Sequence, residues 1–149
     1  MVQRQHFASS PSTILIIEND ASNRFLVEKI VSISGYHYLS ASNGKDALEL
    51  LTYQHVDIVL TDLSMPDLDG YDVIRLIRQL PAHRVTPIIA LTAFSFYDEQ
   101  QRALAMGCSE IVTKPYRPRE LLDIIARHLQ MPFDNGASQQ DVHHISAQV

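Results

Sequence analysis

The fold is decided by residues 56–67, which read VDIVLTDLSMPD. Apart from Asp57, the run Val56–Leu60 is apolar and rich in β-branched side chains. Such a short apolar run is typical of a strand that is covered on both faces of a parallel sheet. Hydroxyl and carboxylate side chains follow it at once, beginning with Thr61 and Asp62. The stretch therefore predicts a buried strand with polar side chains at its carboxyl end.

Four other short apolar runs flank this strand in the sequence, at Thr13–Ile17, Tyr36–Leu39, Pro87–Leu91 and Glu110–Thr113. After each of the five runs, apolar residues recur at the spacing of one helix face. These stripes are Leu26, Ile30 and Ile33; Ala47, Leu50 and Leu51; Val73, Ile74 and Ile77; Ala103 and Met106; and Leu121, Ile124 and Ile125 with His128 or Leu129. Strands that alternate with helices in this way predict an α/β fold with a parallel sheet and helices on both faces.

The chain has 149 residues, which is enough for one domain with a substantial core. The alternating pattern covers residues 13–130, and we expect these residues to form the folded unit. Residues 1–12 and 131–149 are polar, so we expect a flexible N-terminal arm and a flexible tail there.

The composition excludes several classes of protein. Lys and Arg number 12 and Asp and Glu number 17, and a net charge of −5 is unfavourable for binding nucleic acid, whose phosphates require clustered basic charge. With Cys108 as the sole cysteine, neither an intramolecular disulfide nor a cysteine-based zinc site is possible. The polar start resembles no signal peptide, and the apolar runs are too short to cross a bilayer. We therefore predict a cytoplasmic protein that binds neither nucleic acid nor membrane.

Polar side chains stand at the predicted carboxyl ends of four strands, where parallel sheets place their functional sites. They occur in the segments Glu18–Asp20, Thr61–Asp67, Thr92-Ala93 and Lys114-Pro115. Carboxylate oxygens favour Mg²⁺, and a nearby lysine can pair with a carboxylate or a phosphoryl oxygen. A metal-assisted aspartate can also attack phosphorus and form an aspartyl phosphate. Asp62 is the best candidate for that nucleophile, because it follows the most hydrophobic central run.

These segments resemble, in their order and spacing, the response-regulator receiver domain of two-component phosphorelay systems, in particular its chemotaxis-regulator-like members. The resemblance covers residues 13–130 and rests on four segments: Ile14–Asn19, Asp62–Gly70, Ala90–Ala93 and Thr113–Pro115. Intervals of 44, 30 and 22 residues separate Glu18, Asp62, Thr92 and Lys114. The resemblance implies a flavodoxin-like, doubly wound sheet of five parallel strands in the order 2-1-3-4-5, with five helices.

The resemblance also implies a role for individual residues around the metal. Asp62 matches the phosphoacceptor, while Glu18, Asn19, Asp62 itself and the backbone carbonyl of Ser64 match the groups that hold Mg²⁺. The family usually has Asp where this chain has Asn19. Because an amide oxygen is neutral, we expect Mg²⁺ to bind weakly.

Three further positions match residues around the phosphoryl group. Thr92 matches the hydroxyl that contacts the phosphate, and Lys114 matches the lysine that does so. Pro115 matches a proline that usually follows a cis peptide bond, an isomer that is energetically reasonable only before proline.

The output surface is expected at Phe94, Phe96 and Tyr97, together with Ile111. An alternative for the aromatic residues is that at least one of them packs into the core. Ile111 stands where the family often has Tyr or Phe. The aromatic side chain that usually reports phosphorylation is therefore missing, and we expect a different relay.

The resulting prediction is a stand-alone response regulator. It receives a phosphoryl group on Asp62 from a histidine kinase or a histidine phosphotransfer protein, and it signals by contact with a downstream protein. It is not an enzyme beyond its own phosphorylation and dephosphorylation. Asn19 and Ile111 motivate one alternative, a degenerate receiver that acts as a phosphorylation-independent binding module.

Two enzyme hypotheses fit the sequence less well. A phosphatase with an aspartate nucleophile requires a second Asp two residues later, where this chain has Ser64. A nucleotide- or flavin-binding protein requires a Gly- or Ser/Thr-rich loop after the first strand, where Glu18–Asp20 would repel phosphate. A simpler interpretation of Glu18–Asp20, as a cluster that caps the following helix, stays open.

Overall fold

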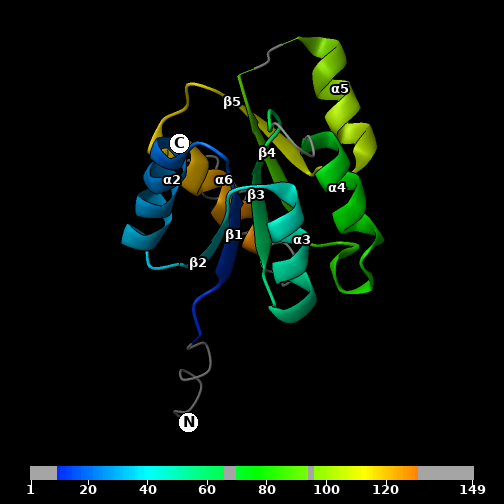
Figure 1. Ribbon diagram of the computed structural model, residues 1–149. Coiled ribbons are helices and arrows are strands. Elements are labelled where there is room, and N and C mark those ends of the chain that lie inside the picture. Colours follow the sequence, from blue (N-terminus) through cyan, green and yellow to red (C-terminus); the bar gives the residue numbers. More distant parts are fainter. Residues whose placement is uncertain (1–9, 66–69, 94–95, 131–149) are drawn as a thin grey trace, which may run out of the picture.

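The computed structural model of the protein describes residues 10–65, 70–93 and 96–130. Its centre is a sheet of five parallel strands in the order β2-β1-β3-β4-β5 (Figure 1). The strands are β1 (Thr13–Ile17), β2 (His37–Ala41), β3 (Ile58–Asp62), β4 (Ile88–Thr92) and β5 (Glu110–Thr113). The predicted fold class and strand order are confirmed. Most of the predicted arm and the whole predicted tail lie outside the described residues.

Helices cover both faces of the sheet, as predicted. In the described ranges they are α2 (Ala21–Ile33), α3 (Gly44–Tyr53), α4 (Gly70–Gln79), α5 (Tyr97–Met106) and α6 (Pro118–Gln130), with a 3₁₀ turn η1 (Pro81–His83) after α4. Helices α2 and α6 lie on one side of the sheet, and α3, α4 and α5 lie on the other (Figure 1). None of the helices in this part of the chain is both long enough and apolar enough to span a membrane.

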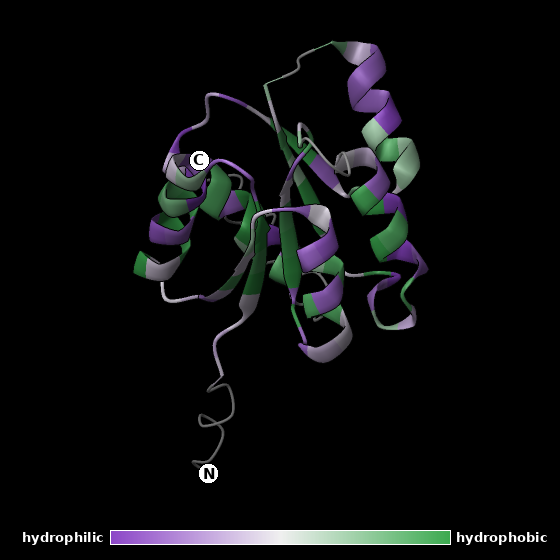
Figure 2. Ribbon diagram, in the orientation of Figure 1, coloured by the Kyte–Doolittle hydropathy of each residue, from purple (hydrophilic) through white to green (hydrophobic). Residues whose placement is uncertain are grey.

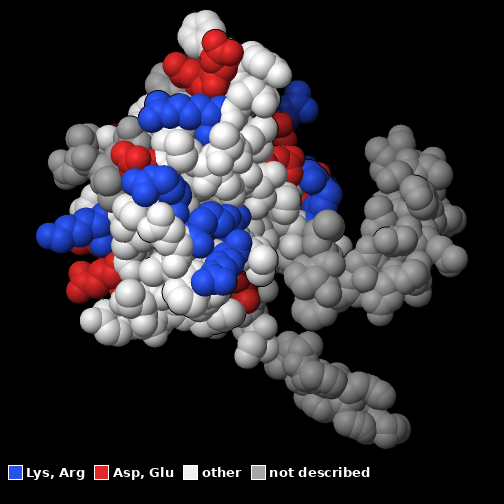
Figure 3. Space-filling model, turned by 90° about the vertical axis from the view of Figure 1, so that its right-hand side faces the viewer, with Lys and Arg blue, Asp and Glu red and all other residues white. Residues whose placement is uncertain are grey.

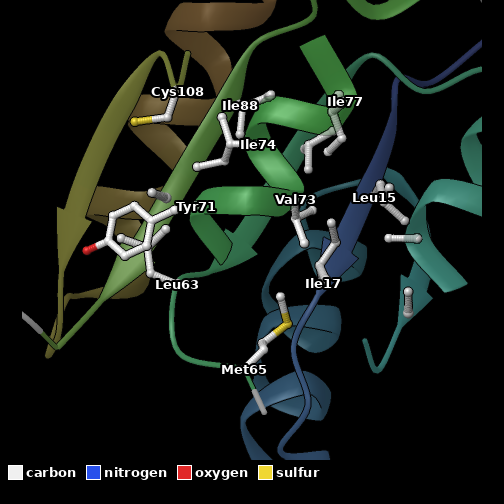
Figure 4. Close-up of a cluster of buried hydrophobic side chains, with 14 of the residues drawn as sticks. Leu15, Ile17, Leu63, Met65, Tyr71, Val73, Ile74, Ile77, Ile88 and Cys108 are labelled. Carbon is white, nitrogen blue, oxygen red and sulfur yellow. The ribbon is translucent and has the colours of Figure 1, made fainter. Parts of the chain in front are cut away.

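The sheet separates two hydrophobic cores, and alternation along the strands decides which side chain enters which core. In β1, Leu15 and Ile17 pack with α3 and α4 (Figure 4), whereas Ile14 and Ile16 pack with α2 and α6. Successive strand residues point to opposite faces, so a strand between two helix layers is apolar at every position. Figure 2 shows the resulting continuous hydrophobic colour along the central strands. This explains why the run at Val56–Leu60 lacks a polar alternation.

Local features fix three of the helix ends. The Asp20 carboxylate accepts a hydrogen bond from the Asn23 amide at 2.8 Å and caps α2. The Asn43 side chain caps α3 in the same way, through the Asp46 amide at 2.8 Å. Helix α5 ends at Gly107, whose φ of 116° lies in the left-handed region that glycine adopts without a steric penalty.

Three strands end later than the apolar pattern predicts. The predicted runs at Val56–Leu60, Pro87–Leu91 and Tyr36–Leu39 correspond to β3, β4 and β2, whose last residues are polar or small. Asp62 still pairs with Leu91, and Thr92 still pairs with Thr113. The ladder uses main-chain groups, so it continues past the last apolar side chain. Asp62 and Thr92 are therefore strand residues, and pairing with the neighbouring strand holds the main chain of each in place.

His83 is a buried polar side chain at the opposite edge of the sheet from these residues. Only 2% of it is exposed, and its Nδ1 lies 3.0 Å from the Thr86 hydroxyl. Burial lowers the pKa of His83, and the nearby His55 and Arg78 lower it further, while a hydrogen bond with the main chain of Leu51 acts in the opposite direction. The folded protein therefore favours the neutral imidazole.

We expect acid to destabilise the protein partly through His83. A lowered pKa in the folded state means that stability is fully present above the ordinary value of 6.5 and is lost as the pH falls below it. For one proton the slope is at most about 1.4 kcal/mol per pH unit. Urea unfolding of wild type and His83→Gln between about pH 5 and pH 8 checks this, with the exposed His37→Gln as control. An unchanged slope in His83→Gln would contradict the assignment.

Candidate functional site

Three predicted residues meet at the carboxyl edge of the sheet. The Lys114 ammonium lies 3.3 Å from Oδ2 of Asp62 and 3.6 Å from Oε1 of Glu18. The side chains of Glu18 and Asp62 are only 5% and 10% exposed, while that of Lys114 is 28% exposed. Two buried carboxylates thus share one lysine. A pair of ionised carboxylates beside a single ammonium group leaves one negative charge, which favours an additional cation.

The main chain fixes the position of Asp62. Asp62 is the last residue of β3, and the next amide, that of Leu63, donates to the Leu91 carbonyl of β4 at 3.3 Å. The amide of Ser64 then turns back and donates to Oδ1 of Asp62 at 3.0 Å. One carboxylate oxygen is therefore held by the main chain, while the other faces Lys114.

Glu18 lies directly after β1 and is held by both its main chain and its side chain. Its amide donates to the Ala41 carbonyl, and its Oε2 accepts a hydrogen bond from the Asp20 amide at 3.0 Å. Burial raises the pKa of Glu18; the Asp20 amide and Lys114 oppose this rise, and the Asp62 carboxylate adds to it. The pKa of Glu18 is raised because this side chain is partly removed from water and lies close to a second acid, Asp62.

Thr92 and Pro115 complete the edge of the site. Thr92 ends β4 and is 1% exposed, and its carbonyl accepts a hydrogen bond from the Lys114 amide at 2.8 Å. The peptide bond between Lys114 and Pro115 is cis, the isomer expected for this position. Lys114 thus directly follows β5, which is the neighbour of β4, the strand that carries Thr92.

The remaining predicted metal ligands lie at the rim. Asn19 and Ser64 are exposed, whereas Asp20 is occupied as the cap of α2, so the capping interpretation holds for Asp20. Within the described ranges, no three His, Cys, Asp or Glu side chains form a metal-binding group. The acidic side chains that the structure brings together at the site are those of Glu18 and Asp62, through their shared contact with Lys114. Their oxygens fit a hard divalent cation, with less negative charge than a site with a third carboxylate.

The predicted output surface is only partly exposed. Phe96 and Tyr97 are 70% and 73% exposed, so neither packs into the core. Ile111 is half-buried and packs against the core beneath α4 and α5. Phe94 lies outside the described residues, as does the segment 66–69 of the motif that ends at Gly70.

Two residues near the site were not predicted from the sequence, Arg24 and Tyr116. The Arg24 guanidinium donates to the Glu18 carbonyl at 3.0 Å and is backed by Glu28, whose Oε2 lies 4.0 Å away. Burial raises the pKa of the Tyr116 hydroxyl, and the charges of Glu18 and Asp62 raise it further. The position of Tyr116 directly after Pro115 could have indicated that it lies near the site. For Arg24, the sequence offered no indication beyond its place near the start of α2.

Gly70 is also closer to the site than the sequence indicated. It opens α4, and its amide donates to the Leu63 carbonyl at 3.0 Å. A Cβ at this position would overlap the Cα of Leu63 and lie 2.5 Å from the carbonyl oxygen of Asp62. Only glycine allows α4 to begin in contact with the main chain that carries Asp62.

A groove of about 290 Å³ opens beside the charged cluster, between α2 and the segment after β5. One end is formed by Glu18 and Lys114. The other lining residues are largely apolar: Asn23, Leu26, Val27, Ile30, Leu91, Pro115, Tyr116 and Pro118. The charged cluster therefore borders an apolar surface, part of which is the exposed Leu26.

Comparisons with known proteins agree with this geometry. The family model of the response regulator receiver domain matches residues 14–126. A probable transcriptional regulator ycf27 of Porphyridium aerugineum is 39% identical over 108 residues, which are 72% of this chain and 44% of that protein. The sensor histidine kinase RcsC of Escherichia coli K12 is 36% identical over 128 residues, which are 86% of this chain and 13% of that protein. The chain thus spans less than half the length of either relative.

A solved structure is similar over most of the chain. The receiver domain of the sensor histidine kinase PA1611 from Pseudomonas aeruginosa PAO1, with a magnesium ion coordinated in its active-site cleft, has a TM-score of 0.76 and 31% identity. The similarity covers 80% of this chain and 98% of that one. With the matching strand order and the cluster of Glu18, Asp62 and Lys114, these findings show that the chain belongs to the response regulator receiver domain family of two-component systems.

Proposed function

We propose that Asp62 accepts a phosphoryl group from the phosphohistidine of a histidine kinase or a histidine phosphotransfer protein. The observation that carries the proposal is the contact of 3.3 Å between Lys114 and a buried Asp62 carboxylate whose other oxygen is held by the Ser64 amide. A carboxylate oriented in this way presents one oxygen toward a positive charge that can also hold a phosphoryl oxygen.

In the proposed reaction, a carboxylate oxygen of Asp62 attacks phosphorus and forms an O–P bond. The P–N bond of the phosphohistidine breaks, and its electron pair stays on the leaving imidazole, which takes up a proton. Lys114 neutralises charge on the transferred group, and the Thr92 hydroxyl donates to one of its oxygens. The product is an acyl phosphate on Asp62, which water can later hydrolyse.

We further propose that Glu18, Asn19, Asp62 and the Ser64 carbonyl hold Mg²⁺, by similarity to the magnesium-bound PA1611 receiver domain. When bound there, the ion supplies positive charge to the carboxylate and phosphoryl oxygens. The neutral amide of Asn19 makes the site less acidic than one with Asp at that position, which supports weak binding.

We infer that the output is contact with a downstream protein in the cytoplasm. Basic and acidic side chains are interspersed on the face formed by α4 and α5 (Figure 3), and the net charge is −5. Neither feature favours nucleic acid or an acidic membrane surface. The stand-alone arrangement of this receiver domain stays a prediction.

Mass spectrometry after incubation with acetyl phosphate tests the proposal. We expect a gain of one phosphoryl group that requires Mg²⁺ and is absent in Asp62→Asn, because the amide is not nucleophilic. Asp123→Asn, an exposed residue of α6, is the matched control and should label like wild type. Labelling of Asp62→Asn to the same extent would overturn the assignment of Asp62.

A second candidate is a binding module that acts without phosphorylation. Asn19 favours it, because a neutral amide in place of a carboxylate binds a divalent cation less strongly. The absence of any adduct in a folded protein, with both acetyl phosphate and a phosphorylated kinase, would support this candidate over the first.

A further inference from the structure

Helix α5 carries the exposed residues Phe96 and Tyr97 at its start but is lightly attached to the domain. The structure describes all of α5, and Ala103 is its one fully buried residue. Phe96 occupies the N-cap position and makes no side-chain capping hydrogen bond. Helix α4, in contrast, buries five residues. A helix with so little buried surface is held by few contacts, so each contact strongly affects its position.

Tyr71 of α4 provides one of these contacts. Its side chain is buried in the core, where it lies beside Leu63 (Figure 4). The Tyr71 hydroxyl donates to the Glu99 carbonyl in the first turn of α5, at 3.5 Å. The guanidinium of Arg102 lies 4.0 Å from the centroid of the Tyr71 ring. A cation over a ring is attracted by the negative face of the ring, so α5 holds Tyr71 at two points.

The other end of this connection is the phosphoacceptor. Gly70 precedes Tyr71 and packs directly on the main chain of Asp62 and Leu63. A displacement of that main chain must therefore move the start of α4. Ile111, on the neighbouring strand β5, has an aliphatic side chain without a ring or a hydroxyl, so it cannot make equivalent contacts with α5.

We propose that Tyr71, with Arg102 on its ring, couples the state of Asp62 to the position of helix α5. The order of contacts runs from Asp62 and Leu63 through Gly70 to Tyr71, and from Tyr71 to α5. The exposed end of α5 at Phe96 and Tyr97 is the surface that changes. This proposal rests on the proposed function of Asp62, and the coupling is reciprocal, as any linkage between two equilibria must be.

A tryptophan placed on α5 tests the coupling. The chain contains no tryptophan, so the Phe96→Trp variant gives a single fluorescent reporter at the start of α5. We expect its emission to change when acetyl phosphate and Mg²⁺ phosphorylate the protein. Adding Arg102→Gln should reduce that change by a factor of about two to five, the effect of losing a cation–π contact at an exposed site. Adding Tyr71→Leu should abolish it.

Two further variants separate the coupling from general effects. Tyr71→Phe keeps the ring and loses the hydroxyl that makes the long hydrogen bond to Glu99, so most of the change should remain. Lys29→Gln removes a lysine that lies 5.4 Å from the Phe25 ring on α2, and it should leave the response of the α5 reporter intact. The phosphoryl content of each sample is measured by mass. Full responses in Arg102→Gln and Tyr71→Leu at equal phosphoryl content would overturn the proposal.

A third measurement does not depend on phosphorylation. In the Phe96→Trp background, hydrogen exchange of the α5 amides is compared for Asp62→Ala, Arg102→Gln and the double variant. Coupling predicts that the two effects are not additive, whereas additive effects would overturn it. If Asp62 accepts no phosphoryl group but the effects are coupled, the proposed function fails and the connection between Asp62 and α5 stands.

Discussion

Replacement of Gly70 by Ala is expected to lower the free energy of unfolding by about 3 kcal/mol, at the upper end of the cost of overpacking a core. The reason is the identity of the atoms that the new Cβ would meet. They are the Leu63 Cα and the Asp62 carbonyl oxygen, both main-chain atoms of the segment that carries Asp62. A side chain could rotate away from such an overlap, but a strand end in a hydrogen-bonded ladder cannot. Urea unfolding followed by circular dichroism measures the loss.

Gly35→Ala separates this steric cost from the cost of backbone conformation. Gly35 has a φ of 93°, but a Cβ there would meet nothing within 4 Å. We expect Gly35→Ala to cost only about 1 kcal/mol and to leave phosphorylation intact. Gly70→Ala should also lose phosphorylation while still folded at low temperature, because Asp62 is displaced relative to Lys114. A Gly70→Ala protein as stable and as readily phosphorylated as wild type would show that the close approach does not exist.

Replacement of Asn19 by Asp is expected to tighten Mg²⁺ binding by roughly tenfold, or about 1.4 kcal/mol. Two unit charges about 4 Å apart interact by about 4 kcal/mol at an effective dielectric constant of about 20, and a divalent ion by more. Asn19 is exposed, so solvent screens most of this energy. Phosphorylation by acetyl phosphate should rise in parallel at low Mg²⁺ concentrations. Isothermal titration calorimetry measures the affinity.

Asp20→Asn is the control for Asn19→Asp. Asparagine caps a helix about as well as aspartate, so α2 should remain stable. The variant changes the charge at the neighbouring position without changing a proposed ligand, and we expect a much smaller effect on Mg²⁺ affinity. Equal and opposite effects in the two variants would mean that Asn19 acts only through the general field. An unchanged affinity in Asn19→Asp would mean that Asn19 does not contact the metal.

The fold could be predicted from the sequence because apolar runs and helical stripes depend on nearby residues. The strand order entered through the resemblance, and the structure reproduces it. The pairing of Asp62 and Lys114 across 52 positions in the chain follows from the rule that strand ends converge. Local patterns of apolar residues were therefore enough to predict the strands and the helices.

Other features could not be predicted, because they depend on distances between distant elements. The overlap that requires Gly70 depends on how closely α4 approaches β3, and no pattern of neighbouring residues encodes that distance. Arg24 is an ordinary helix residue until its guanidinium is found on the Glu18 carbonyl. The later ends of β3 and β4 were missed since ladder hydrogen bonds do not depend on side-chain polarity.

The position of Asp62 and Thr92 within the hydrogen-bonded sheet limits which parts of the chain can move near them. Both residues end strands that are buried along their whole length. Moving either main chain inward along its strand would break hydrogen bonds that stabilise the sheet by about 1 kcal/mol each. The strands therefore resist displacement as far as Asp62 and Thr92. A group added to Asp62 is expected to displace mainly the chain that follows the strand end, from Leu63 to the start of α4.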